Sequence, residues 1–249
     1  MSDWPSGYGR HVLAQVDSTL NEAARLAPEL SGPVWILAHR QTAARGRRGR
    51  AWVTTEGNLS ATLVMRPEGG PGVAALRSFV AALALYDAVA DVTGRTEGLS
   101  LKWPNDVLLN GGKLAGILLE SAGATGGVRH LAIGIGVNLA EAPPPDCVEP
   151  LAVRPVSLMG ETGMSIQPEG FLTVLASRFA HYERQMQDFG FEPIRTAWLE
   201  RAARLGEPIM ARTARSETSG IFETIDATGN LVLGTQSGQV TIPAAEIYF

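Results

Sequence analysis

Apolar runs separated by polar and glycine-rich turns predict both strands and helices in this chain. Runs of strand length predict strands at 34–39, 59–65, 105–109, 113–121 and 128–139. Apolar side chains at helical spacing predict helices at 19–27, 73–93, 168–188 and 192–204. Thr19 and Glu22 form a capping-box pattern, and Asn110-Gly111-Gly112 is typical of a hairpin turn. Hairpins mixed with helices indicate the α+β class.

The pattern changes after Gly206, where short β-rich runs are separated by glycine and polar turns. Their spacing of about 8–12 residues is typical of a small barrel or sandwich. The runs lie at 207–213, 220–225, 230–234 and 239–243. We therefore predict two domains, 1–205 and 206–249.

Composition excludes several classes of protein. The chain has 249 residues, of which 45% are hydrophobic, so its bulk is not disordered. Its 28 glycines follow no three-residue period, which excludes collagen. A net charge of −4 argues against a general nucleic-acid binder.

Three observations predict a cytoplasmic protein that does not enter a membrane. The longest apolar run, 79–86, ends at Asp87 and is shorter than the ~20 residues that a spanning helix needs. The first ten residues lack the apolar core of a signal peptide. The single cysteine, Cys147, has no partner for an internal disulfide, which fits a reducing compartment.

The two lysines of the chain lie close together. Lysine and arginine total 21, yet only Lys102 and Lys113 are lysines. GC-rich coding accounts for arginine on the surface, where any solvated cation serves. Ammonium and guanidinium groups are not interchangeable at a tight site, however. The clustering therefore favours a local demand for compact charges.

The strongest local feature is the segment 41–52, called here the Arg-Gly loop, which holds four arginines between Arg45 and Arg50. Spaced glycines let backbone N–H groups close on an anion, and guanidinium groups bind phosphate or carboxylate in a bidentate manner. A solvated basic loop that touches RNA is the simpler interpretation of this segment alone.

A second segment combines cations with a carboxylate, an amide and an aromatic ring: Lys102-Trp103-Pro104-Asn105-Asp106, followed by Lys113. By itself it is also compatible with an ordinary hairpin. Phosphate-loop and zinc-protease motifs are absent from the sequence, the four histidines have no metal-ligand spacing, and nothing marks Cys147 as a nucleophile. Together the two segments suggest a site that activates a carboxylate with a nucleotide.

At this point the sequence resembles the biotin-protein ligase family, from residue 10 to its last residue. The resemblance rests on Asp17-Ser18-Thr19, Gln41 with Arg45 to Trp52, Lys102 to Asp106, Gly112 to Leu118, and Gly134-x-Gly136-x-Asn138. It implies a mixed β-sheet flanked by helices, related to lipoate ligases, and a C-terminal SH3-like β-barrel.

The resemblance also implies a two-step reaction that uses ATP, biotin and Mg²⁺. Biotin would be activated as biotinyl-5'-AMP and then transferred to a lysine of a biotin carboxyl carrier protein. The implied catalytic residues are Lys113, Arg47, Asp106 and Lys102. The biotin site would hold Ser18, Thr19, Leu20, Gln41, Arg45, Gly46, Arg47, Lys113 and Gly116. The nucleotide would contact Arg48, Trp52, Asn105 and Asn138. A homodimer is a further expectation from the family.

Two departures from the family pattern carry expectations of their own. Only 16 residues precede Asp17, too few for the DNA-binding module of many members, so we expect a ligase without a DNA partner. The usual loop begins Gly-Arg-Gly, but this one has Ala44 in the first position. Because alanine rarely adopts positive φ, either the position never needs it or the loop closes less tightly.

Three alternatives stay open at this stage. A lipoate-protein ligase shares the fold and the adenylation chemistry. A nucleic-acid-binding module could use the Arg-Gly loop, although the net charge and the lack of interleaved aromatics count against it. A ligase-like protein without activity is the third, for which Ala44 is the hint.

Overall fold

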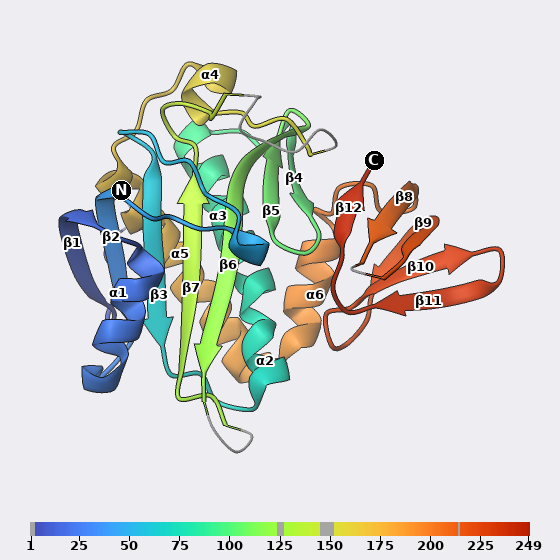
Figure 1. Cartoon of the computed structure of the whole chain (residues 1–249), viewed down its shortest axis with the longest axis horizontal. Coiled ribbons are helices and arrows are strands. Elements are labelled where there is room, and N and C mark those ends of the chain that lie inside the picture. The colour runs from blue at the N-terminus through green and yellow to red at the C-terminus, as the bar shows by residue number, and fades with distance from the viewer. Residues whose placement is uncertain (1–2, 124–126, 145–151, 214) are drawn as a thin grey trace.

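The computed structural model describes residues 3–123, 127–144, 152–213 and 215–249. Two β-sheets dominate it (Figure 1). The larger is mixed and has the order β1-β2-β3-β7-β6-β5-β4. Its strands are β1 (Gly9–Val16), β2 (Val34–Gln41), β3 (Leu59–Met65), β4 (Leu99–Lys102), β5 (Asp106–Leu109), β6 (Gly112–Ala122) and β7 (His130–Val137). Among the paired strands of this sheet in the described residues, β1 and β2 are the only parallel pair. The α+β class and the mixed sheet are confirmed.

Helices cover both faces of this sheet (Figure 1). α3 and α5 pack together on one face, and α1 lies on the other with Leu20 and Ala23 against Ile36 and Val64. Neighbouring strand residues such as Trp35 and Leu37 face the opposite way, into the main core. The helices are α1 (Thr19–Leu26), α2 (Pro71–Ala75), α3 (Arg77–Thr93), α4 (Leu158–Thr162), α5 (Pro168–Phe189) and α6 (Phe191–Leu199).

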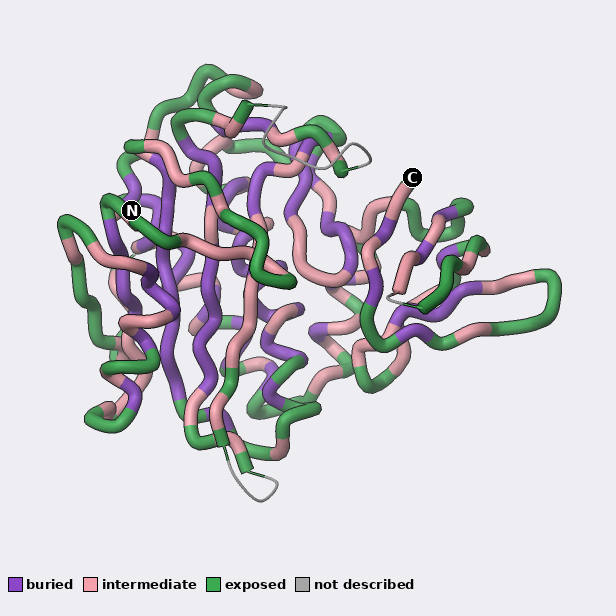
Figure 2. Tube along the Cα trace, in the orientation of Figure 1, coloured by how far each residue is buried: buried purple, intermediate pink, exposed green. Residues whose placement is uncertain are grey.

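Helices α2 and α3 form one apolar segment, Pro71–Thr93, whose most apolar 18-residue stretch has a mean hydropathy of 1.6. By length and composition alone this segment could cross a membrane. The uninterrupted apolar run 79–86 is therefore only part of a longer apolar helix. In the fold, however, 67% of its most apolar stretch is buried. Figure 2 shows the same burial along the chain trace at the centre of the molecule. The segment is thus the central helix of the core.

Residues beyond 206 form a second, antiparallel sheet with the order β11-β10-β9-β8-β12. Its strands are β8 (Pro208–Arg212), β9 (Glu217–Ile225), β10 (Leu231–Thr235), β11 (Gly238–Ile242) and β12 (Glu246–Tyr248). This small β-rich unit agrees with an SH3-like domain, but within the described residues β11 and β12 do not pair to close a barrel. Trp198 contacts Phe222 with 6.5 Å between ring centroids, so the core continues from α6 into this sheet.

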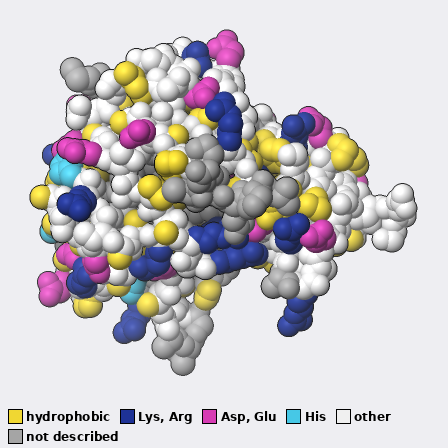
Figure 3. All heavy atoms as spheres, turned by 45° about the horizontal axis from the view of Figure 1, so that its top comes forward, with side chains coloured by type: hydrophobic (Ala, Val, Ile, Leu, Met, Phe, Trp, Pro, Cys, Tyr) yellow, Lys and Arg dark blue, Asp and Glu magenta, His cyan; other side chains and the backbone are white. Residues whose placement is uncertain are grey.

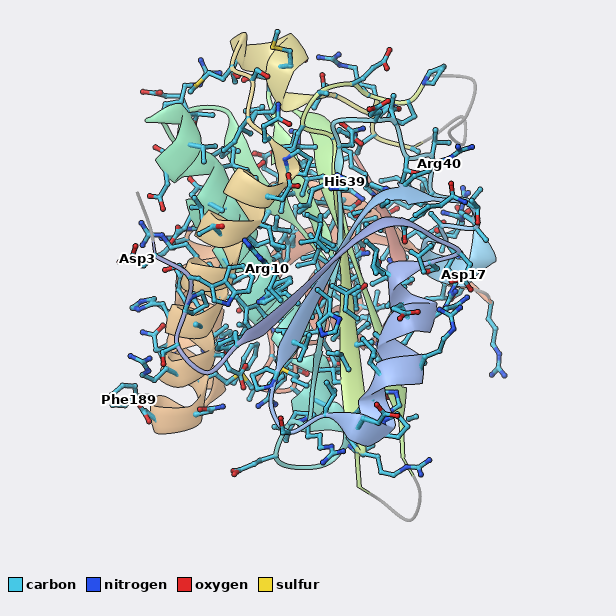
Figure 4. All side chains as sticks on the ribbon, turned by 90° about the vertical axis from the view of Figure 1, so that its left-hand side faces the viewer. Asp3, Arg10, Asp17, His39, Arg40 and Phe189 are labelled. Carbon is cyan, nitrogen blue, oxygen red and sulfur yellow. The ribbon has the colours of Figure 1, made fainter. Side chains whose placement is uncertain are left out.

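The largest differences from the predicted elements lie at edges and ends. β1 was not predicted because it is an edge strand with mostly exposed side chains, including Arg10 (Figure 4). α6 ends at Leu199 rather than 204, where the chain turns toward the second sheet. The cap of α1 is Ser18, whose Oγ accepts a hydrogen bond from the Leu20 N–H, so the predicted capping box at Thr19 is wrong by one residue.

Candidate active site

A cavity of about 700 Å³ lies beside α1 and the Arg-Gly loop. Further lining residues come from the first turn of α1 and from strands β5, β6, β7 and β12. Figure 3 shows lysine and arginine side chains gathered near the middle of the molecule. The structure brings these predicted residues together around the cavity: Ser18, Thr19, Leu20, Gln41, Arg45, Gly46, Arg47, Trp52, Lys102, Asn105, Asp106, Lys113, Gly116 and Asn138. Arg48 is not part of the lining, although its ion-pair partner Glu246 is.

Hydrogen bonds fix the polar end of the cavity beside α1. The Thr19 backbone N–H and its Oγ1 both donate to Gln41 Oε1, at 2.8 and 3.1 Å. Thr62 Oγ1 donates to Thr19 Oγ1 at 2.8 Å, from below in β3. Since Thr19 and Thr62 are buried, these side chains cannot rotate freely. Gln41 is thereby held at the end of β2 with its amide oriented by the first turn of α1.

The Arg-Gly loop closes on itself through backbone hydrogen bonds. Gly46 N–H donates to the Arg50 carbonyl at 2.7 Å, and Trp52 N–H donates to the Ala44 carbonyl at 3.1 Å. Between them, Arg48 has φ 57° and Gly49 has φ 73°. The positive φ that a tight loop requires therefore falls at these two residues. Ala44 has no positive φ, so the first family glycine is not needed here.

We expect Ala44→Gly to leave the release of a bound adenylate unchanged. The backbone at residue 44 already has a conformation that alanine adopts without strain. The measurement is the rate at which preformed adenylate leaves the protein, followed by rapid filtration. Slower release from the glycine variant would show that Ala44 limits closure of the loop.

The arginines of the loop have different partners. Arg45 binds Glu120 of β6 with Nε and Nη2, at 2.9 and 2.8 Å, and donates to Asn21 Oδ1 at 2.7 Å. The hydrogen bonds to Glu120 raise the pKa of Arg45. Arg47 instead reaches Asn105 Oδ1 and the Ala245 carbonyl, both at 3.3 Å. Burial lowers the pKa of Arg47. The nearby carboxylates of Asp106 and Glu246 do not fully offset the cost of burying its charge.

Strand β12 contributes a carboxylate that was missed from the sequence. Glu246 lies 3.3 Å from Arg48 Nη1 and 2.6 Å from Arg50 Nη2, and Tyr248 donates a hydrogen bond to it. Burial alone would raise the pKa of Glu246, but the Tyr248 hydroxyl and the two arginines outweigh it and lower the pKa. The C-terminal sheet thus holds the outer side of the Arg-Gly loop. Nothing near residue 246 signalled this role, because the contact spans about 200 positions of sequence.

Both lysines face the cavity beside one carboxylate. Lys113 Nζ forms an ion pair with Asp106 Oδ1 at 2.8 Å, and that oxygen is buried. Lys102 is only 9% exposed. Burial lowers the pKa of Lys102; the Asp106 charge opposes this shift, whereas Lys113 and Arg47 add to it. Three cations around one carboxylate leave a net positive site for an anion.

The side chains of the two candidate asparagines, Asn105 and Asn138, form hydrogen bonds within the protein. Asn105 Nδ2 donates to the Ile117 carbonyl at 2.6 Å while its Oδ1 accepts from Arg47. Asn138 is buried, and its Nδ2 donates to the Val156 carbonyl at 3.0 Å. Both residues therefore stabilise the walls of the cavity through these hydrogen bonds, independently of any bound ligand. Cys147 lies outside the described residues.

Two family models match this chain. The model described as "Biotin/lipoate A/B protein ligase family" matches residues 12–138, and the model "Biotin protein ligase C terminal domain" matches residues 205–249. Together they include most of the residues that line the cavity.

Individual proteins are similar over most of their length. The biotin–[acetyl-CoA-carboxylase] ligase of Paracoccus denitrificans is 58% identical over 96% of this chain and 99% of that protein. The bifunctional ligase/repressor of Bacillus subtilis is 33% identical over 95% of this chain and 71% of that protein. Among solved structures, the biotin protein ligase of Aquifex aeolicus in complex with biotin and ATP has a TM-score of 0.82 and 26% identity, covering 96% of this chain and 97% of that one.

Proposed function

Because this chain belongs to the biotin/lipoate A/B protein ligase family, and within it to the biotin protein ligases, we propose that its cavity binds biotin and ATP side by side. The chain is a biotin protein ligase, which consumes ATP to attach biotin to a protein. The observation that carries the residue assignment is the convergence of Arg47, Lys102 and Lys113 around Asp106 in one cavity.

The end of the cavity beside α1 is the proposed biotin site. Leu20 offers an apolar contact for the biotin rings, and Ser18, Thr19 and Gln41 offer hydrogen-bonding groups whose positions are fixed. The biotin carboxylate then extends toward Lys113 and the Arg-Gly loop, including Arg45, Gly46 and Arg47. Gly116 completes the floor there.

Trp52 marks the proposed nucleotide end of the cavity. Its indole is an aromatic surface on which an adenine ring can stack. This end is bordered directly by Asn105 and Asn138. Arg48 acts there through its ion pair with Glu246, which lines the cavity. Lys102, at the end of β4, faces the phosphates.

In the first step, a biotin carboxylate oxygen attacks the α-phosphorus of ATP, and the bond from this phosphorus to the bridging oxygen of pyrophosphate breaks. The two reacting anions repel each other, so fixed positive charge lowers the barrier. Lys113 and Arg47 supply it at the carboxylate, and Lys102 supplies it at the phosphates. The product is biotinyl-5'-AMP.

Mg²⁺ fits this site as a companion of the nucleotide. Within the described ranges, no three histidine, cysteine, aspartate or glutamate side chains gather to hold a metal ion. Mg²⁺ commonly binds through phosphates, water and one carboxylate, and Asp106 places a carboxylate on the cavity wall. The ion neutralises phosphate charge when bound.

In the second step, a lysine amine of the carrier protein attacks the carbonyl of biotinyl-5'-AMP, an amide bond forms, and AMP leaves. Asp106 is placed to orient that amine and to take its proton, since it lies at the start of β5 on the cavity wall. The ion pair with Lys113 keeps the carboxylate in position.

The carrier subunit of acetyl-CoA carboxylase is the proposed partner, as in the name of the Paracoccus relative. We also propose a homodimer, for which the exposed edge strand β1 offers unpaired backbone groups. The net charge of −4 supports the absence of a DNA partner, and a single cysteine supports a cytoplasmic location. The domains proposed are 1–205 and 206–249.

Incubation with biotin, ATP, Mg²⁺ and a carrier domain tests the function directly. Mass spectrometry should show one biotinyl group on a single carrier lysine. ATP–pyrophosphate exchange with biotin or lipoate as the acid separates the two ligase activities. Exchange that depends on lipoate and not on biotin would overturn the proposal.

The scarcity of lysine permits a footprint of the site. An amine-reactive probe has three targets on this chain: Lys102, Lys113 and the terminal amine. We expect biotin, ATP and Mg²⁺ to protect both lysines, because the ligands cover them and bound phosphate raises the lowered pKa of Lys102. Peptide mapping measures the rates, with the terminal amine as internal reference. Equal labelling of the lysines with and without ligands would contradict their placement in the site.

A further inference from the structure

Three glycines form the floor of the cavity and are called here the glycine floor. Gly134 and Gly136 lie two residues apart on β7, so both face the same side of the sheet. Gly116 of β6 pairs directly with Gly136 in the strand register. All three residues line the cavity. A floor without side chains lets other groups lie directly on the backbone.

Trp52 lies on the Gly136 end of this floor. A Cβ atom at residue 136 would be 2.5 Å from Cε2 of the indole, 2.6 Å from Nε1 and 2.7 Å from Cζ2. Cε2 is shared by the two rings, so an approach in the ring plane would meet Nε1 or Cζ2 first. The ring therefore presents its face to Gly136. A Cβ at Gly116 would be 3.2 Å from Cζ3 and 3.4 Å from Cη2 of the same indole.

Gly134 supports a different side chain. A Cβ atom there would lie 3.1 Å from Cγ, Cδ1 and Cδ2 of Leu20, which belongs to α1. The glycine floor is thus divided, with Leu20 over one part and Trp52 over the other. The division follows the two halves of the proposed site, which meet at Gly116, where a Cβ would also be 3.4 Å from Cε of Lys113.

We propose that Gly136, assisted by Gly116, is a positioning residue for the nucleotide, because it lets the Trp52 indole lie flat with its other face available to adenine. Gly134 in turn sets the position of Leu20 for biotin. The inference rests on the proposed function and specifically on the nucleotide role of Trp52. Any side chain at residue 136 moves the indole by roughly an ångström to restore ordinary contact, which narrows the space for the base.

Two matched alanine variants on the same strand test this assignment. We expect Gly136→Ala to raise the KM for ATP about 5- to 150-fold, the loss of one base–aromatic stacking contact, with the biotin Kd unchanged. Gly134→Ala should raise the biotin Kd and leave the KM for ATP unchanged. The KM is measured by pyrophosphate exchange at saturating biotin, and the Kd by calorimetry without ATP. A variant that merely disturbed strand pairing would impair both ligands.

A double-mutant cycle shows whether Gly136 acts through Trp52. Trp52→Ala and Trp52→Ala/Gly136→Ala should have the same KM for ATP, because the displaced ring is already gone. Additive losses would overturn the proposal. A Cβ at residue 116 would be farther from the Trp52 ring than one at residue 136, so Gly116→Ala should raise the KM for ATP by a smaller factor. This variant keeps the test decisive if Gly136→Ala does not fold. Wild-type protein without biotin-dependent exchange would overturn the function itself, whereas active wild type with equal effects of Gly134→Ala and Gly136→Ala would overturn only the glycine assignment.

Discussion

Lys113→Ala should form biotinyl-5'-AMP about 10²–10³-fold more slowly than the wild type, while its fold is retained. The substitution removes a cation at the meeting point of the carboxylate and the α-phosphate. It also leaves Asp106 without the ion pair that Lys113 forms at 2.8 Å. The freed carboxylate then repels both incoming anions, so one substitution acts twice on the same barrier. Biotin-dependent ATP–pyrophosphate exchange measures this step alone.

Two controls separate position from charge for Lys113. Arg178→Ala removes a cation from α5, where its partner is Asp91 on α3, and should leave exchange unchanged. Lys113→Arg keeps the charge but replaces a compact ammonium by a broad guanidinium group. We therefore expect its rate of ATP–pyrophosphate exchange to stay below that of the wild type. Near-normal exchange by Lys113→Ala would refute the assigned role.

Arg47→Gly should release biotinyl-5'-AMP at least about tenfold faster, because the variant loses two hydrogen bonds from a charged group. Those bonds connect the loop to Asn105 beside β5 and to the Ala245 carbonyl before β12. Without them the loop keeps its own turn and its ion pairs with Glu120 and Glu246, but it loses the contacts that Arg47 makes across the cavity. The escaped adenylate then acylates any amine that it meets.

Labelling of an unrelated lysine-rich protein, in the absence of a carrier, measures this escape. Arg95→Gly is the matched control, since Arg95 is exposed and lies just after α3. It should give the same low background as the wild type. Equal labelling by Arg47→Gly and the wild type would count against retention of the adenylate by Arg47.

The parts of the fold predicted from sequence are those where the core dictates the pattern. Strand β3 is buried at every position and was predicted with its observed bounds, 59–65. Strand β1 alternates too weakly to be recognised, because its outer edge faces solvent. β4 and β12 have only four and three residues, too few for a period to emerge.

The candidate site shows the same limit in another form. Clustered motifs placed Lys102, Asp106 and Lys113 together because a hairpin connects them locally. Glu246 and Glu120 were not predicted, since a lone glutamate in a strand carries no local signal. Only the folded chain shows that Glu120 binds Arg45 and that Glu246 binds Arg48 and Arg50.

The placement of both lysines in the cavity leaves the outer surface of the protein without a lysine amine. Biotinyl-5'-AMP that escapes into solution acylates accessible primary amines, and the lysines of most proteins are scattered over the surface. Here Lys102 is buried and Lys113 is paired with Asp106, and the sequence holds no others. Arginine, which carries the remaining positive charge of the chain, forms no such amide under these conditions. An acyl adenylate that has left the cavity therefore meets no lysine on the outer surface of this protein, where the terminal amine is the remaining primary amine.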